Sequence, residues 1–151
     1  MKSFLKYWLP VLFWLGLIFI GSTDLMSAQQ TSRIIGPILR WFNPEISAAA
    51  IAQVQFVVRK IAHVSEYAIL ATLLWRALRL GVAWTTKMSI LFVVTLCACA
   101  LFAASDEFHQ SLVPSRTASA VDVLLDLVGA LVGVAICIAV GRRKVVKEKR
   151  G

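Results

Sequence analysis

Charged residues are scarce in this chain, and acidic residues are the scarcest of them. Lys, Arg, Asp and Glu make up 16% of the 151 residues, whereas hydrophobic residues make up 59%. A soluble domain usually has about 25% charged and about 45–50% apolar residues. This composition argues against a soluble globular domain. A mean hydropathy of +0.78 indicates instead that most of the surface faces something other than water.

Cysteine and linker sequence are also in short supply. The three cysteines, Cys97, Cys99 and Cys137, all lie within apolar runs. An odd number without a framework spacing argues against disulfides, and small buried apolar side chains are the simplest interpretation. No long Pro/Gly/Ser linker, low-complexity run or repeat of solenoid length occurs. Residues 1–151 are therefore expected to form a single domain.

Four apolar runs have a length close to that of a membrane span. A helix needs about 20 predominantly apolar residues to cross the hydrocarbon core. The sequence therefore predicts an all-α, polytopic membrane protein built as a bundle of four transmembrane helices. The predicted spans cover about residues 7–21, 57–80, 88–105 and 120–140, and a basic tail follows at residues 141–151.

The first span has an alternative interpretation. Lys2 and Lys6 precede the apolar run Leu9–Ile20, and small residues follow at positions 21–23. A basic start, a short apolar run and small residues also describe a cleaved signal peptide. No clean Ala-x-Ala site is present, which favours a retained span.

A long loop of about residues 22–56 separates the first two spans. Within it, residues 33–42 are apolar, with basic residues at Arg33 and Arg40 and a tryptophan at Trp41. Such a composition suits a segment that lies in the outer membrane interface. Asn43-Pro44 should end this segment. A new helix is expected to start near Ser47 and to continue into the second span.

The distribution of basic residues predicts the orientation. With four spans, the N-terminus, the second loop and the C-terminus share one side, which holds 11 Lys and Arg against 5 on the other. Because Lys and Arg concentrate on the cytoplasmic side, both termini are predicted to be cytoplasmic. Seven of the eight acidic residues fall at or near the outer ends of the spans. The net charge of +8 lies at helix ends and in the tail, which suits anionic lipid and not nucleic acid.

Polar side chains enter the outer end of the second span. Arg59, His63 and Glu66 have i, i+4, i+7 spacing, and Lys60, His63 and Tyr67 have i, i+3, i+7 spacing. Both sets lie along one stripe of a helix. Ionisable groups at such depth are costly and usually face the bundle interior or a water-filled cavity. The second span is therefore expected to contribute to a polar pocket.

The third span ends in a polar run, and a turn with one basic residue follows. Asp106, His109 and Gln110 share a face, Glu107 stands beside them, and Arg116 lies in the turn. A functional cluster is one interpretation of this run. A solvated helix end is the other.

The fourth span carries two aspartates on the same face as two glycines. Asp122, Asp126, Gly129 and Gly133 have i, i+4, i+7, i+11 spacing. The glycine pair marks a close helix–helix contact, so both aspartates are expected to point into the bundle. Ser119-x-x-Asp122 also reads as a capping box at a helix start. For Asp126 the alternative is a buried ion pair with one of the basic residues on the outer side.

Three motifs together resemble the VanZ-like family in spacing and order. Many family members have Asn at the position of Asp126, so this chain differs there by an added carboxyl group. The resemblance implies a bacterial inner (plasma) membrane protein; the family's prototype is associated with low-level teicoplanin resistance, and no reaction is implied. The motifs are Lys60-x-x-His63-x-x-Glu66-Tyr67, Asp106-Glu107-x-x-Gln110-x-x-x-Pro114-x-Arg116 and Asp122-x-x-x-Asp126-x-x-Gly129, and Ser22-Thr23-Asp24 after the first span is also similar.

The sequence predicts that three helix ends form a polar pocket at the extracytoplasmic membrane face. Basic side chains there suit binding of a phosphate, and His or carboxylate side chains suit general acid–base catalysis. The head group of a lipid-linked precursor or a phospholipid is therefore the expected partner, besides the bilayer itself. The candidate catalytic residues are His63, Glu66, Asp106 and Glu107, and the candidate ligand-binding residues are Arg59, Lys60, Tyr67, His109, Gln110, Arg116, Asp122 and Asp126.

Two other functions remain open at this point. A metal-dependent membrane enzyme is one, because several His, Asp and Glu side chains are nearby in sequence. However, no HExxH motif occurs, and Arg59 and Lys60 would repel a cation, so no metal or other cofactor is predicted. The other is a structural protein in which the charges form an inter-helix network that sets helix register, with function in a partner protein.

Overall fold

All secondary structure that the computed structural model describes is helical. The structure describes residues 2–24, 28–81, 87–114 and 118–148, and no strand occurs among them. This confirms the predicted all-α fold. The helices are α1 (Lys2–Gly21), α2 (Ala28–Phe42), α3 (Ala48–Arg76) with a π-helical continuation η2 (Ala77–Gly81), α4 (Met88–Ser111) and α5 (Ala120–Glu148).

Three helices are long and apolar enough to cross a membrane. They contain the segments Phe4–Gly21, Met88–Ser111 and Ala120–Gly141. Large apolar side chains on their outward faces, such as Phe13, Leu101 and Leu124, are exposed on the protein surface. These helices identify a membrane protein. Helix α3 is not among them: its 29 residues include Arg59, Lys60, Glu66 and Arg76 as well as other polar residues.

Helices α4 and α5 continue past the C-terminal ends of the predicted spans. Helix α3 begins where expected: the Ser47 hydroxyl accepts a hydrogen bond from the Ala50 backbone N–H at 3.1 Å and caps the helix. Helix α4, however, continues through Ser111, whereas the predicted span ended at residue 105. The polar run that starts at Asp106 is therefore helical, as the predicted shared face of Asp106, His109 and Gln110 requires. Helix α5 likewise continues through most of the predicted basic tail.

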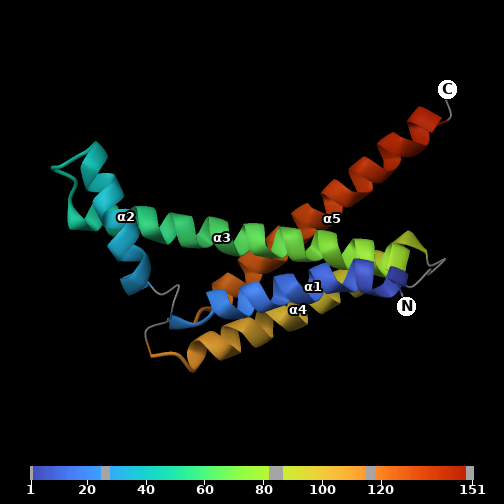
Figure 1. The fold of residues 1–151 in the computed structure, drawn as a ribbon, viewed down its shortest axis with the longest axis horizontal. Helices are drawn as coiled ribbons and strands as arrows, with labels where there is room; N and C mark the ends of the chain where they lie inside the picture. Colours follow the sequence, from blue (N-terminus) through green and yellow to red (C-terminus); the bar gives the residue numbers. More distant parts are fainter. Residues whose placement is uncertain (1, 25–27, 82–86, 115–117, 149–151) are drawn as a thin grey trace.

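Helix α3 is the central element of the fold. Figure 1 shows α1 and α4 running beside its second half, α5 crossing it, and α2 lying at its N-terminal end. The apolar core lies where α1, α3, α4 and α5 meet. Its most buried members are Val11, Tyr67, Leu70, Ala71, Cys99, Ala103, Ala130 and Val134.

Helices α3 and α5 approach one another until their backbones touch. A Cβ atom at Gly129 would lie 2.2 Å from the carbonyl oxygen of Val64, and one at Gly133 would lie 2.2 Å from that of Ala68. Neither separation is sterically allowed, so only glycine fits. This confirms the close helix contact that the glycine spacing predicts.

The three cysteines are free thiols, as the sequence suggests. Cys99 is buried and Cys137 is partly buried, but Cys97 is exposed. The expectation that all three are buried is therefore wrong for Cys97. Its position on α4 faces outward, between positions that pack inward.

Helix α2 has an exposed apolar side and a side that packs against α3. Ile34, Ile38 and Trp41 are exposed on one side. The other side lies against α3, where Ser32 and Gln55 exchange hydrogen bonds of 2.9 and 3.1 Å. The helix ends at Phe42, immediately before Asn43-Pro44, as expected.

Candidate functional site

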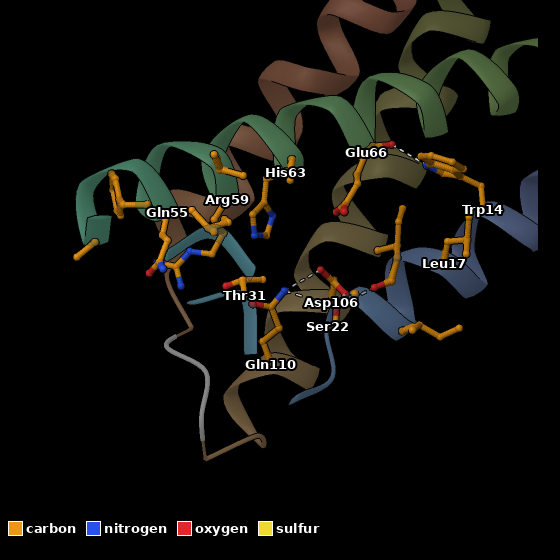
Figure 2. A pocket seen from close by; sticks show the side chains of 18 residues that line it. Trp14, Leu17, Ser22, Thr31, Gln55, Arg59, His63, Glu66, Asp106 and Gln110 are labelled. Atoms are coloured by element: carbon orange, nitrogen blue, oxygen red, sulfur yellow. Dashed lines mark hydrogen bonds between the residues drawn. The ribbon is translucent and has the colours of Figure 1, made fainter. Parts of the chain in front are cut away.

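A cavity of about 650 Å³ lies between α1, α2, α3 and α4. Figure 2 shows side chains from these four helices around it. One part of its wall is apolar and includes Leu17, Ile20, Ile35, Phe56 and Val58. The polar part comprises Ser22, Thr31, Gln55, Arg59, His63, Glu66, Asp106 and Gln110.

Helical periodicity explains why the polar residues converge. Gln55, Arg59, His63 and Glu66 follow one another at intervals of three or four residues, so they share one face of α3. All four point from α3 towards the cavity in Figure 2. The face of α4 with Asp106 and the end of α1 lie opposite. The cavity therefore has charge and hydrogen-bonding groups on both sides.

His63 is held from behind by a carboxylate of α5. Its Nδ1 lies 3.0 Å from Oδ1 of Asp126. Asp126 is completely buried and does not line the cavity, whereas His63 is 5% exposed and does. Asp126, predicted to contact a ligand, instead contacts the side of His63 that faces away from the cavity.

Arg59 and Lys60 are neighbours in sequence but have different surroundings. Lys60 forms an ion pair with Asp122 on α5, and neither residue lines the cavity. Arg59 does line the cavity, and among the described residues it forms no ion pair. Its Nε is buried without a hydrogen-bond partner in the described part of the chain. Its guanidinium lies 6.0 Å from the centre of the Phe56 ring.

Asp106 joins α1 to α4 on the far side of the cavity. The Ser22 hydroxyl donates a hydrogen bond to Oδ1 of Asp106, and Gln110 Nε2 donates to Oδ2 at 3.1 Å. Ser22 was not among the predicted site residues. Its one signal was the family resemblance of the segment after the first span. Thr31 and Gln55 were also missed, because isolated polar residues outside a motif carry no signal.

Glu66 is positioned by a contact from α1. The Trp14 indole N–H donates a 2.9 Å hydrogen bond to the Glu66 backbone carbonyl. The Glu66 side chain projects into the cavity beside His63 in Figure 2. Both Trp14 and Glu66 line the cavity. The hydrogen bond from α1 therefore fixes the position of the Glu66 backbone, which carries this carboxylate.

Three further predicted site residues, Glu107, Tyr67 and His109, do not line this cavity. Glu107 is buried between α4 and the start of α5, where its Oε1 accepts a hydrogen bond from the Ser119 backbone N–H. Tyr67 and His109 line a second cavity of about 210 Å³, and Asp106 lines both cavities. The His109 ring stacks on Phe19 with centroids 4.5 Å apart.

Arg116, predicted to hold phosphate, lies outside the described residues. Among the residues that the structure does describe, no group of three or more His, Cys, Asp or Glu side chains is arranged to hold a metal ion. The cavity thus offers one guanidinium, one imidazole, two carboxylates and several neutral hydrogen-bonding groups. The wall therefore has charges of both signs beside an apolar surface.

The chain matches the sequence model of a known protein family. The sequence model of a family described as VanZ/LLP1 matches residues 7–141, a range that includes every residue of the cavity wall. No curated protein and no solved structure matches the chain.

Proposed function

The chain belongs to the VanZ/LLP1 family, and on this premise we propose that it binds the polar head group of an envelope lipid in the cavity. The ligand is a lipid-linked precursor or a phospholipid. The observation that supports this is the two-part wall, in which Arg59 and its polar neighbours face apolar side chains of α1, α2 and α3. Cavities of about 300–1,000 Å³ with few convergent polar groups are typical of small-molecule sites.

Arg59 suits a phosphate as the recognised group, and the carboxylates of Glu66 and Asp106 line the same wall. Guanidinium groups bind phosphate through charge-assisted hydrogen bonds. Lys60 already has a carboxylate partner, whereas Arg59 has none among the described residues. Arg59 is therefore the principal contact for the head group. Leu17, Ile35 and Phe56 supply apolar surface for the first part of its chain.

Removing the Arg59 charge should weaken binding of a phosphate amphiphile. The probe is dodecyl phosphate, titrated into full-length protein in dodecyl maltoside micelles, where the detergent provides the same chain without phosphate. A hydrogen bond to a charged group contributes about 1.5–3 kcal/mol, so Arg59→Gln should raise the Kd at least about tenfold. Calorimetry or ³¹P NMR measures this.

The matched control is Arg76→Gln, the same change on the same helix at an exposed residue outside the cavity wall. It should bind dodecyl phosphate as the unmodified protein does. Equal affinities of the Arg59→Gln and Arg76→Gln variants for dodecyl phosphate would contradict the proposed contact at Arg59. Absence of saturable binding of dodecyl phosphate to the unmodified protein would contradict the proposed phosphate site itself.

We further propose that α3 is the fourth transmembrane helix. It has 29 residues, enough to cross a bilayer, and its polar face is directed at the cavity and at α5 instead of at lipid. Four crossings of a bacterial inner membrane place both termini in the cytoplasm and the cavity at the extracytoplasmic face. The exposed apolar face of α2 then lies in the outer interface.

Cysteine labelling should reveal this topology. In a variant without the three native cysteines, a membrane-impermeant maleimide should label Glu45→Cys in intact spheroplasts. It should label Glu148→Cys only after permeabilisation. If only α1, α4 and α5 cross, the two positions lie on the same side and label together.

The family resemblance also links this protein to glycopeptide resistance. Expression in a teicoplanin-sensitive host should raise the inhibitory concentration of the drug. Arg59→Gln should abolish the increase and Arg76→Gln should not. An increase that survives Arg59→Gln would separate resistance from the cavity.

A second candidate function is purely structural. The ion pair of Lys60 with Asp122 and the hydrogen bond between His63 and Asp126 both connect α3 to α5. They favour a network that fixes helix register. This function predicts no saturable ligand and no special reactivity of His63.

A further inference from the structure

We infer that His63 is a general base directed at the cavity and that Asp126 is its positioning residue. The inference rests on the proposed head-group binding for the identity of the group acted on. The arrangement of the two side chains does not depend on it.

The hydrogen bond to Asp126 determines which nitrogen of His63 carries the proton. An ionised carboxylate only accepts hydrogen bonds. Because Asp126 Oδ1 lies 3.0 Å from Nδ1, that nitrogen must donate. Nε2 of a neutral ring then holds a lone pair. A buried carboxylate that orients a histidine in this way is the arrangement that many enzymes use for proton transfer.

The free nitrogen faces the cavity. His63 belongs to the cavity wall, and its ring projects into the cavity in Figure 2. Nε2 forms no hydrogen bond to any residue that the structure describes, and it is not among the buried polar atoms without a partner. A molecule in the cavity can therefore reach it. Arg59 stands one helical turn away on the same face and can hold an anionic group beside it.

Close helix packing keeps the pair in place. Gly129 lies one turn after Asp126 and touches the backbone of Val64, the residue next to His63. The helix contact thus sets the separation of the two side chains within one turn of the pair. Preorganisation of this kind is what acid–base groups need.

The inferred step is a proton transfer. Nε2 accepts a proton from a water molecule or an alcohol beside the head group. The O–H bond breaks, an N–H bond forms at Nε2, and the electron pair stays on the oxygen. The positive charge of the imidazolium is balanced by Asp126. The step leaves a nucleophilic oxygen next to the group at Arg59 and needs no oxidant or reductant.

The experiment uses full-length protein in dodecyl maltoside micelles and the two histidines of the chain. ¹⁵N NMR of histidine-labelled protein, assigned with His109→Gln, should show His63 as the Nδ1–H tautomer. Diethyl pyrocarbonate should modify His63 at Nε2, as followed by peptide mass spectrometry. Dodecyl phosphate should slow this modification. His109 is the internal reference within the same sample.

Asp126→Leu tests the positioning role. The Asp126 carboxylate holds the ring in the tautomer with a free lone pair on Nε2, so modification of His63 at Nε2 should slow relative to that of His109. The rate at His109 should not change, which also reports that the variant is folded. Should this variant not fold, the tautomer of the unmodified protein still decides: an Nε2–H ring overturns the inference.

The results separate the two proposals. If dodecyl phosphate does not bind but His63 has the expected tautomer and Asp126-dependent reactivity, head-group binding fails and the base assignment stands. If dodecyl phosphate binds but His63 is inert or insensitive to Asp126→Leu, the base assignment fails alone. If the protein is purely structural, dodecyl phosphate does not bind and His63 shows no special reactivity, and both proposals fail.

Discussion

Replacing Gly129 with alanine is expected to separate α3 from α5 and to cost most of the stability of the protein. The new Cβ would lie 2.2 Å from the Val64 carbonyl oxygen and 2.9 Å from its carbonyl carbon. These are backbone atoms, which cannot rotate away as a side chain does. Overpacking commonly costs about 1–3 kcal/mol. Because relief here requires the whole helix to move, we expect a loss at or above about 3 kcal/mol.

Thermal unfolding followed by fluorescence-detected size exclusion measures this loss. Gly16→Ala is the matched control, because a Cβ at that position of α1 meets no atom within 4 Å. Gly133→Ala should behave like Gly129→Ala, since its Cβ would meet the Ala68 carbonyl oxygen at 2.2 Å. A Tm of Gly129→Ala equal to that of Gly16→Ala would mean that the helices do not pack as described.

The second large effect concerns the ion pair between Lys60 and Asp122. Their side chains are 19% and 3% exposed, so the pair is largely removed from water. Breaking a buried pair by removing one member costs about 3–5 kcal/mol, because an uncompensated charge remains. Lys60→Met should therefore cost about 3 kcal/mol or more, because it leaves the buried Asp122 carboxylate without its partner. Asp122→Leu should cost less, because water reaches the remaining Lys60 more easily than it reaches Asp122.

The double variant Lys60→Met/Asp122→Leu should recover most of this stability. Replacing both members by apolar residues of similar size is often neutral or stabilising. The measurement is a double-mutant cycle from thermal or denaturant unfolding in detergent. Additive losses in the double variant would show that the two side chains do not interact. Because neither Lys60 nor Asp122 lines the cavity, the double variant should still bind dodecyl phosphate.

Much of this architecture follows from periodicity alone. Apolar runs of about the length of a membrane span predicted the helices, and the spacing of Gly129 and Gly133 predicted where two of them touch. Ser47 predicted the start of α3. The shared face of Arg59, His63 and Glu66 was also readable, because it depends only on residues within one helix.

What the sequence could not supply is the rotation of each helix against its neighbours. Arg59 and Lys60 are adjacent and of equal charge, yet α3 turns one to the cavity and the other to Asp122. Asp106 and Glu107 divide in the same way between α1 and α5. Such choices depend on contacts between distant segments. Local spacing contains no information on them.

The end of α4 differs from the bound of the predicted span. The span was expected to end at about residue 105, where the polar run begins, because ionisable groups are costly inside a membrane. The helix continues because these groups have partners. Asp106 and Gln110 bond to each other across one turn, and Ser22 and Ser119 supply further hydrogen bonds.

Helix α2 connects the cavity to whatever surrounds the protein. Thr31 and Ile35 on one side form part of the cavity wall, while Ile34, Ile38 and Trp41 on the other side are exposed. With α2 in the outer interface as proposed, a change in lipid packing would act on the same helix that forms part of the cavity wall. We therefore expect the affinity of the cavity for a ligand to differ between a micelle and a bilayer.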